Sequence, residues 1–378
     1  MPALLGGFGE KFSPLINNKP KQTLDVEIEK SPKNPRLAPV FYIQKKNYSS
    51  LSSSKLKMDQ SNTEKINLLG SYLAGLIEGD GTIAVHENII LKNKHCPKII
   101  IVFHKNDTPL ANHLRDSLNV GTIYKPTGPN HVLWQIQDLL GVIKIINIIN
   151  GYMRTPKIEA LDRAINWINA EIVSQTTKSC KNKTPSQFLG VVLQTIKLKP
   201  LNNSPLDSDS WLAGFSDADG SFNITIAKRK KEGRIGHWRV TTRFSIELRQ
   251  TYHREVRQAL ATTVSYETVL LKVATLLKVN LYSRTRIMAK TNNIVNSYTV
   301  MSFNQVSNEI LRNYFNTFPL FSSKHLAFQD WCKVQDICKR EKQEKLDNIS
   351  LDSCQKIKDN FNTKRNYFTW SHLVNFYC

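Results

Sequence analysis

Long apolar runs and paired cysteines are both missing from this sequence. No stretch approaches 18 consecutive apolar residues, the length of a membrane-spanning helix, and apolar segments such as GVIKIINIIN (141–150) are interrupted by Lys and Asn. The six cysteines are scattered, with no CxxC and no paired histidine, so neither a zinc site nor a disulfide framework is indicated. The first residues lack the features of a secretory signal or a transit peptide. We therefore expect no membrane partner and a reducing compartment.

Acidic residues are also scarce relative to basic ones. The 378 residues include 52 Lys and Arg against 31 Asp and Glu, which gives a formal net charge of +21. Such an excess favours an anionic partner, of which nucleic acid is the commonest. The length allows two ordinary domains of roughly 100–200 residues with extensions.

Composition divides the chain into five parts. Six of the fifteen prolines lie within the first 39 residues and a Ser-rich stretch follows, so we expect a disordered leader over 1–60. Periodic apolar patterning fills 61–175 and 208–345, and a polar segment at 176–207 is the expected linker between them. A C-terminal tail covers 346–378.

The two patterned blocks are copies of one unit. YLAGLIEGDGTIAV (72–85) matches WLAGFSDADGSFNI (211–224), with Asp80 and Asp219 separated by 139 residues. Each copy is followed by strand-like runs, a helical stretch, more strand-like runs and a closing helix with a lysine at its start. The repeat predicts an α+β fold in which an αββαββα unit occurs twice.

Small residues recur on one face of each motif helix. Ala74 and Gly75 in the first copy match Ala213 and Gly214 in the second. Two such faces allow helices to approach backbone to backbone. We therefore predict that the two motif helices pack against each other across a pseudo-twofold axis.

Each motif helix ends in Asp-Gly. The glycines, Gly81 and Gly220, suit the left-handed residue that ends a helix. An aspartate there meets the negative end of the helix dipole, which costs about 0.3–1 kcal/mol, and a bound cation would offset that cost. Carboxylates suit Mg²⁺, and two of them with shared metals can support phosphodiester hydrolysis. An ordinary turn is the alternative, which the duplication makes less favoured.

The motifs carry a family resemblance. LAGLIEGDG (73–81) and LAGFSDADG (212–220) closely resemble the signature of the LAGLIDADG homing endonucleases, and the resemblance extends over about 67–345. It implies a monomeric, double-motif DNA endonuclease with saddle-shaped antiparallel sheets and Mg²⁺ (or Mn²⁺) as cofactor. It also implies that the eighth motif residues, Asp80 and Asp219, lie at the metals, together with Gly79 and Ala218. Glu78 and Asp217, at the sixth position, are not the family's primary ligands.

Basic residues near the scissile phosphates are a further feature of this family. Lys157 and Lys324 match the position at the start of each closing helix, with a solvated lysine as the alternative. Many members carry a polar residue, often Gln, in the second long strand. Here Phe103 and Leu248 occupy the corresponding positions, which leaves open how the attacking water is positioned. Binding of DNA without cleavage is therefore one alternative function.

Residues 238–249 alternate between apolar and polar side chains, as a strand with one buried face does. Arginine can contact guanine and lysine can neutralise phosphate, so the polar face and the preceding loop are candidates for DNA contact. A solvated strand face is the alternative. The first block offers fewer basic residues. The candidate DNA-binding residues are Lys228, Arg229, Lys230, Arg234, Arg239, Arg243 and Arg249, with Lys92, Lys94 and Lys98 in the first block.

The first nine residues, MPALLGGFG, resemble part of cytochrome c oxidase subunit one. An exon remnant joined to the reading frame of a group I intron would explain this, whereas chance similarity is the alternative. The resemblance implies synthesis in the mitochondrial matrix and double-stranded DNA of the intronless allele as substrate. An RNA maturase that binds its host intron RNA is the main alternative function, and both roles can coexist.

Overall fold

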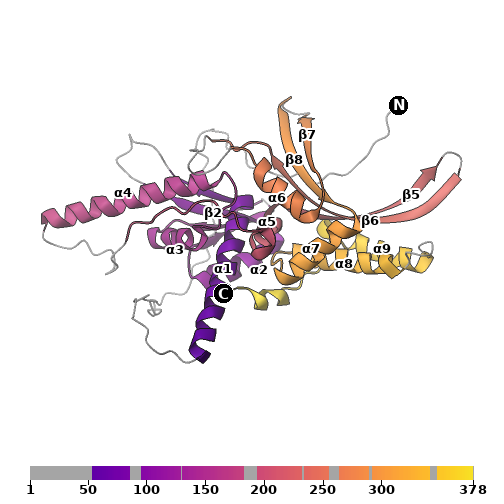
Figure 1. The fold of residues 1–378 in the computed structure, drawn as a ribbon, viewed down its shortest axis with the longest axis horizontal. Helices are drawn as coiled ribbons and strands as arrows, with labels where there is room; N and C mark the ends of the chain where they lie inside the picture. The colour runs from indigo at the N-terminus through magenta and orange to yellow at the C-terminus, as the bar shows by residue number, and fades with distance from the viewer. Residues whose placement is uncertain are drawn as a thin grey trace.

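The computed structural model describes residues 53–85, 95–128, 130–182, 194–231, 234–254, 264–288, 292–340 and 347–377. These residues form two halves that lie side by side, each built on a four-stranded antiparallel sheet (Figure 1). No helix in the described ranges is both long and apolar enough to cross a membrane. The exon-like start, Lys92 and Lys94 lie outside the described residues.

The first half begins with the helix that carries the first motif. Its sheet has the strand order β1-β2-β4-β3, with all neighbours antiparallel. Its elements are α1 (Ser53–Asp80), β1 (Gly81–Ala84), β2 (Lys98–His104), α2 (Thr108–Leu118), β3 (Thr122–Tyr124), β4 (His131–Ile136), α3 (Leu139–Ile149) and α4 (Ile158–Asn182).

The second half repeats this order, and its sheet runs β5-β6-β8-β7. The predicted α+β repeat is therefore confirmed. Its elements are α5 (Trp211–Asp219), β5 (Gly220–Lys231), β6 (Arg234–Arg249), α6 (Glu267–Leu277), β7 (Leu281–Ile287), β8 (Ile294–Ser302), α7 (Gln305–Thr317) and α8 (Lys324–Arg340).

Each half contains one helix more than the predicted αββαββα unit. Helices α3 and α7 lie between the last strand and the closing helix, so the unit is αββαββαα. Both start on a side-chain cap: Asp138 accepts from the amide of Gly141 at 2.6 Å, and Asn304 from that of Ser307 at 2.9 Å.

The boundaries between the parts also differ from expectation. Helix α1 begins at Ser53, before residue 61, and α4 continues to Asn182, beyond residue 175. The described part of the linker, from residue 194 onward, is held along the first half by side chains that bind its backbone. The side-chain amide of Asn150 donates a hydrogen bond to Lys197 O and accepts one from Lys199 N, at 2.9 Å each.

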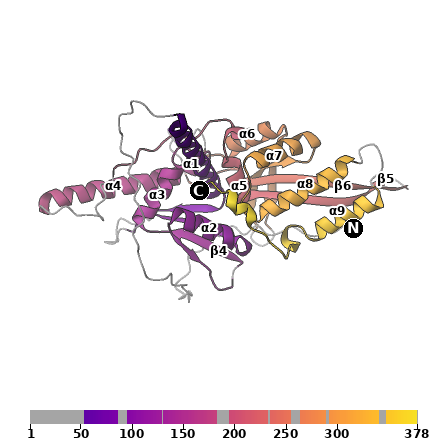
Figure 2. The ribbon, with the colours of Figure 1, turned by 90° about the horizontal axis from the view of Figure 1, so that it is seen from below.

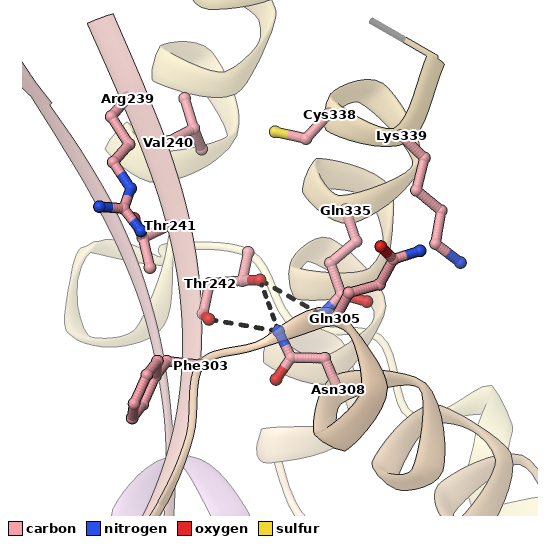
Figure 3. Close-up of a pocket in the computed structure, with 10 residues that line it drawn as sticks. All are labelled: Arg239, Val240, Thr241, Thr242, Phe303, Gln305, Asn308, Gln335, Cys338 and Lys339. Carbon is pink, nitrogen blue, oxygen red and sulfur yellow. Dashed lines mark hydrogen bonds between the residues drawn. The ribbon is translucent and has the colours of Figure 1, made fainter. Parts of the chain in front are cut away.

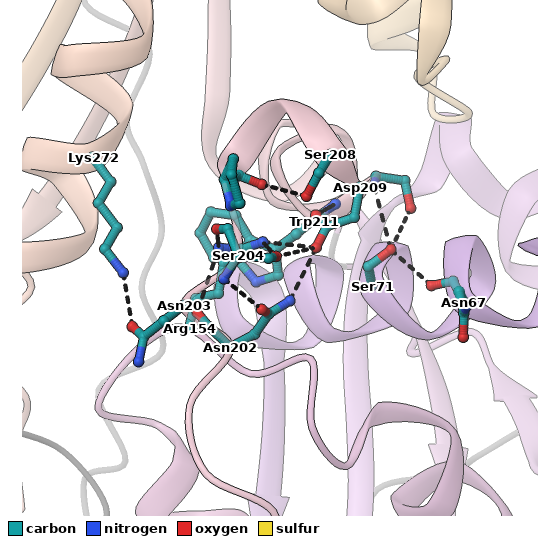
Figure 4. Close-up of polar contacts among 12 residues, drawn as sticks. Asn67, Ser71, Arg154, Asn202, Asn203, Ser204, Ser208, Asp209, Trp211 and Lys272 are labelled. Carbon is teal, nitrogen blue, oxygen red and sulfur yellow. Dashed lines mark hydrogen bonds and ion pairs between the residues drawn. The ribbon is translucent and has the colours of Figure 1, made fainter.

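Arg154 fastens the end of this linker. Its guanidinium donates to Ser204 O at 2.6 Å and to the Asp209 carboxylate at 2.7 Å, one residue before the Ser210 that precedes α5 (Figure 4). Asn202 donates to the same carboxylate at 3.0 Å. The linker therefore delivers the second motif helix to a fixed place beside the first half.

The motif helices α1 and α5 cross between the two halves (Figure 1). A Cβ on Gly75 would lie 2.1 Å from Trp211 O, and one on Gly214 would lie 1.9 Å from Tyr72 O. The neighbouring Ala74 and Ala213 are fully buried. The two backbones thus touch directly, and no larger side chain fits between them.

The glycines after the two aspartates do not adopt the left-handed conformation that the sequence suggested. Gly220 is extended, with φ −71° and ψ 147°, and Gly81 has no positive φ. Each instead begins a strand that leaves the helix end closely: a Cβ would lie 2.6 Å from Ile77 Cα at Gly81 and 2.7 Å from Ser216 O at Gly220. Close packing, not a left-handed turn, requires glycine there.

The residues after α8 return to the midline. Helix α9 (Asn348–Asp359) runs beside α8, and the last described residues lie near α5 (Figure 2). The ring of Phe376 packs edge-on against Tyr72 of the first half at 5.5 Å and against Phe321 of the second at 4.7 Å. The C-terminal segment therefore contacts both halves.

We predict that Gly75→Ala and Gly214→Ala each lower the free energy of unfolding by about 2–4 kcal/mol, because the added methyl must separate two backbones. Chemical denaturation followed by circular dichroism measures this. Lys333→Ala, on the exposed side of α8, is the control and should change stability by less than about 0.5 kcal/mol. Wild-type stability in both glycine variants would contradict the direct backbone contact.

Candidate active site

The two motif helices are related by a pseudo-twofold axis, and their ends meet on it. Ser71 and Ser210, which stand just before the motifs, share a hydrogen bond of 2.7 Å between their hydroxyls. At the other end, a Cβ on Gly79 would lie 2.2 Å from Ala218 Cβ and 3.2 Å from Asp219 Oδ2. Asp80, exposed, and Asp219, half-buried, therefore end the two helices side by side.

Two lysines bind the carbonyl groups at these helix ends. Lys157, just before α4, donates to Ile77 O at 3.0 Å, Gly81 O at 2.9 Å and Gly79 O at 3.4 Å. Lys324, the first residue of α8, donates to Ala218 O at 2.6 Å and Ser216 O at 3.1 Å. Neither is an ordinary solvated lysine. Both place a cation at the negative end of a helix dipole, where it is favourable.

Among the carboxylates near each lysine, the aspartate of the opposite half has the largest effect on its charge. Burial lowers the pKa of both ammonium groups, and nearby carboxylates act against this effect. The carboxylate that does most to raise the pKa of Lys157 is that of Asp219, whereas for Lys324 it is that of Asp80. Each cation therefore donates to carbonyls of its own half, while the aspartate of the opposite half is the carboxylate that most favours its charged form.

The sixth motif position is a buried acid with a structural task. Glu78 is 3 % exposed and accepts hydrogen bonds from the amides of Arg154, at 3.0 Å, and Thr155, at 2.6 Å, and from the Thr155 hydroxyl. Burial raises the pKa of Glu78, while these donors lower it. The carboxylate thus fixes the turn that leads into Lys157.

Asp217 does the same in the second half. It is 6 % exposed and accepts from the amide of Phe321 at 2.7 Å and from the hydroxyl of Ser322. Burial is the main cause that raises the pKa of Asp217. Its turn leads into Lys324. Both acids are thus engaged in hydrogen bonds to these turns.

Each buried acid also binds the aromatic residue that immediately precedes the other motif. Trp211 Nε1 donates to Glu78 at 2.6 Å, and the Tyr72 hydroxyl donates to Asp217 at 2.7 Å. The sequence interpretation missed these two contacts. The signal was present as an aromatic residue immediately before both motifs, together with a hydroxyl residue two positions before each lysine.

The two strand positions that lack the polar residue of many family members lie on the buried side of their sheets. Phe103 is 5 % exposed and borders a cavity of about 120 Å³ together with Asp80, Asp107 and Lys324. Leu248 packs against the core. Asp107 closes part of this cavity, since it accepts from the amide of Ser323 in the opposite half at 2.6 Å. The wall beside Asp80 is therefore partly apolar.

The residues at the helix ends suit a divalent metal that keeps most of its own waters. Two carboxylates and the carbonyls of Gly79 and Ala218 lie at one place, although both carbonyls accept from lysines. No group of three or more His, Cys, Asp or Glu side chains in the described ranges could hold a metal. A site with two carboxylates fits Mg²⁺, whose remaining ligands are commonly water and phosphate oxygens.

The open face of the second sheet is rich in arginine. Arg239, Arg243 and Arg249 project from one face of β6. Two arginines that the sequence interpretation did not select, Arg284 and Arg286 on β7, share this face by strand register. The alternation in LYSRTRI (281–287) could have identified them.

Lys228 does not belong to this face. It pairs with Trp238 on the side of the hairpin that carries the helices, with its ammonium 4.9 Å from the centre of the indole ring. It was a candidate for DNA contact because it begins the basic run, but the strand period turns it away from Arg239 and Arg243. The side chains of Arg229, Lys230 and Arg234 lie outside the described part of the structure.

The open face of the first sheet carries less charge. Lys98 lies at the start of β2, where the exposed side alternates with buried isoleucines. Across the sheet, Gln135 donates to Gln137 at 3.0 Å, and Gln137 to the Tyr124 hydroxyl at 3.4 Å. Amides and an aromatic ring therefore stand where the second sheet has arginines.

A second cavity lies between β6 and helices α7 and α8, away from the motifs (Figure 3). It measures about 170 Å³, and none of its lining residues is a carboxylate. The amides of Asn308 and Gln335 both donate to the Thr242 hydroxyl, at 3.2 and 3.3 Å. Its polar groups thus bind one another, and the helix ends remain the candidate active site.

The model of the LAGLIDADG endonuclease family matches residues 73–168 and 212–335, which contain both motifs and both lysines. The chain belongs to this family. It is 38 % identical, over its whole length and 82 % of the relative, to the "Intron-encoded DNA endonuclease aI3" of Saccharomyces cerevisiae. It is 26 % identical over 82 % of its length to the "Uncharacterized cox1 intron-2 37.2 kDa protein" of Schizosaccharomyces pombe, of which 85 % is covered.

Solved structures share the fold. The LAGLIDADG meganuclease I-CpaMI bound to uncleaved DNA superposes with a TM-score of 0.53 at 17 % identity, covering 78 % of this chain and 99 % of that one. I-SmaMI bound to uncleavable DNA gives 0.52 at 19 % identity, covering 78 % and 97 %. Endonucleases of this family generally depend on divalent metal ions.

Proposed function

We propose that this protein is a monomeric, site-specific endonuclease that hydrolyses both strands of double-stranded DNA. The observation that carries the proposal is the pair of carboxylates, Asp80 and Asp219, at the adjacent ends of two helices packed backbone to backbone. Repulsion between the carboxylates disfavours this arrangement unless cations are present. Lys157 and Lys324 supply two of these cations, and the remaining ones are the metals of the reaction.

The residues of the chain divide the work of hydrolysis. Asp80 and Asp219, with the carbonyls of Gly79 and Ala218 next to them, would hold Mg²⁺ or Mn²⁺. When bound, the metal supplies activation of water and charge stabilisation at phosphate oxygens. Lys157 and Lys324 place a fixed positive charge beside each aspartate, where they can approach a phosphate and stabilise the negative charge that develops on it.

The two open sheet faces would lie along the DNA on either side of the aspartates. In the second half, Arg243 Nε is buried in the sheet without a hydrogen-bond partner among the described residues. The outer nitrogens of this half-buried guanidinium can bind a guanine edge or a phosphate oxygen on the open face. Glu247 already accepts from Arg286 at 2.6 Å, which orients that guanidinium on the same face.

We propose further that the protein acts within mitochondria on the intronless allele of its host gene. Relatives named for introns, one of them for a cox1 intron, support this. So does the exon-like start of the sequence. The substrate would then be the junction of the spliced exons, where the intron is absent.

We predict that Asp80→Asn and Asp219→Asn each reduce double-strand cleavage of the exon-junction DNA at least about 100-fold, because each removes a ligand charge from the metals. Affinity for the same DNA in Ca²⁺ should stay within about threefold of wild type. Asp207→Asn, an exposed aspartate before α5, is the matched control and should cut normally. Cleavage at the wild-type rate by either site variant would refute the proposal.

The opposite orientations of Arg243 and Lys228 allow a second prediction from one hairpin. Arg243→Ala should weaken DNA binding by about 1–3 kcal/mol, since it removes a contact on the open face. Lys228→Ala removes the same formal charge from the other face and should change affinity by less than about 0.5 kcal/mol. Fluorescence anisotropy with the labelled site measures both. Equal losses would mean that net charge, not the sheet face, governs binding.

RNA maturation is a second candidate function. Trp238 is 42 % exposed and lies under the Lys228 ammonium on the helix side of the hairpin, away from the arginine-rich face. Exposed aromatic rings beside cations stack on unpaired bases. The "Intron-encoded RNA maturase bI4" of Saccharomyces cerevisiae is 27 % identical over half of this chain and 23 % of its own. If the host intron splices as well with the Asp80→Asn, Asp219→Asn protein as with wild type, the two roles are separable.

A further inference from the structure

We infer that Trp211 and Tyr72 are positioning residues that act across the midline, so that the motif of each half sets the lysine of the other half. The inference builds on the proposed endonuclease function only where cleavage is measured. Its structural content is two separate paths of hydrogen bonds, which cross the helix interface in opposite directions.

The first path runs from the second half to the first. Trp211 Nε1 donates to Glu78 at 2.6 Å, and Glu78 binds the amide and hydroxyl of Thr155. The Thr155 hydroxyl oxygen accepts from the amide of Lys157 at 3.3 Å. The Lys157 ammonium then reaches the end of α1. An indole of one half is thus three hydrogen bonds away from the lysine of the other.

The second path is its symmetric counterpart. The Tyr72 hydroxyl donates to Asp217 at 2.7 Å, and Asp217 binds the Phe321 amide and the Ser322 hydroxyl. The Ser322 oxygen accepts from the amide of Lys324 at 3.2 Å. The two paths share no side chain, so each can be broken alone.

Burial makes the aromatic donors important for these paths. A buried carboxylate that loses one hydrogen-bond donor keeps its desolvation penalty without the compensation that the donor supplied. Removal of the Trp211 or Tyr72 donor therefore favours reorientation of the acid, and this change releases the turn before the lysine.

Conservative substitutions remove the donors and keep the packing. Trp211 stacks on Phe215 at 4.6 Å between ring centres, and Tyr72 meets Phe321 edge-on at 5.3 Å. Trp211→Phe and Tyr72→Phe each retain an aromatic ring at these contacts. Tyr314→Phe is the matched control: its buried hydroxyl donates to Asp209 O at 2.8 Å, and no step of either path passes through it.

The first test needs neither metal nor DNA. Pulsed reductive methylation with formaldehyde, followed by peptide mass spectrometry, measures how readily each lysine reacts. We expect Trp211→Phe to raise the labelling rate of Lys157 by about 5- to 30-fold, with Lys324 unchanged, and Tyr72→Phe to do the reverse. The control Tyr314→Phe should change neither lysine. If Trp211→Phe folds poorly, Glu78→Gln replaces it in the test. This variant interrupts the first path at the acid and should likewise raise the labelling rate of Lys157 alone.

The second test follows each DNA strand separately in the exon-junction site, with a different label on each strand. Lys157→Met and Lys324→Met identify the strand that each lysine serves. Trp211→Phe should slow the same strand as Lys157→Met, and Tyr72→Phe the same strand as Lys324→Met, so that nicked DNA accumulates with opposite strand bias. The effect should fall on the cleavage rate constant with site affinity within about twofold of wild type.

The inference would be overturned if each variant raised the labelling rates of Lys157 and Lys324 equally. It would also be overturned if each raised chiefly the rate of the lysine in the same half as the substituted aromatic residue. A purely structural role would loosen both lysines together and slow both strands alike. If wild-type protein cuts no DNA but the crossed labelling is found, the endonuclease proposal fails and the positioning role stands. Crossed strand bias without crossed labelling would contradict the lysine paths.

Discussion

The direct contact between the backbones of α1 and α5 is the constraint on which the rest of the structure depends. Because Gly75 and Gly214 leave no side chain between the helices, the helices end close together and at the same level. That closeness places Asp80 beside Asp219 and concentrates negative charge in one small volume. The polar residues around the helix ends offset this charge. The two lysines supply positive charge, and the sixth-position acids hold the turns that carry the lysines.

The response uses cations and buried acids in different places. Lys157 and Lys324 neutralise the helix ends from outside the motifs, and they are held there by turns that the sixth motif acids bind. Since these acids receive a donor from the opposite half, the interface carries polar contacts at the acids as well as at the Ser71–Ser210 pair. A core built only of small and apolar residues would hold the helices together but would leave the lysines unfixed.

The sequence predicted the elements that depend on local pattern and repetition. The duplicated motif, the strand alternation in β6 and the helical stretch between the strand-like runs of each copy follow from periodicity and spacing, which act over a few residues. The same pattern could not give the contacts of Glu78 and Asp217, because their partners lie more than 70 residues away. Nor could it place Lys228, whose basic neighbours suggested the DNA face while the strand register puts it on the other. The glycines after the aspartates were assigned by the commonest use of Gly at a helix end, and tertiary packing decided otherwise.

The docked linker gives the molecule a direction. In a pair of identical subunits either half can meet either half of a target, so such a protein reads a symmetric sequence equally well in both senses. Here Asn150 and Arg154 hold residues 197–209 along the first half, and the second half follows from a fixed point. The sheet that carries glutamines and the sheet that carries arginines therefore keep fixed positions relative to each other. The two ends of a bound DNA site would each meet a different set of side chains, so the site can be asymmetric in sequence.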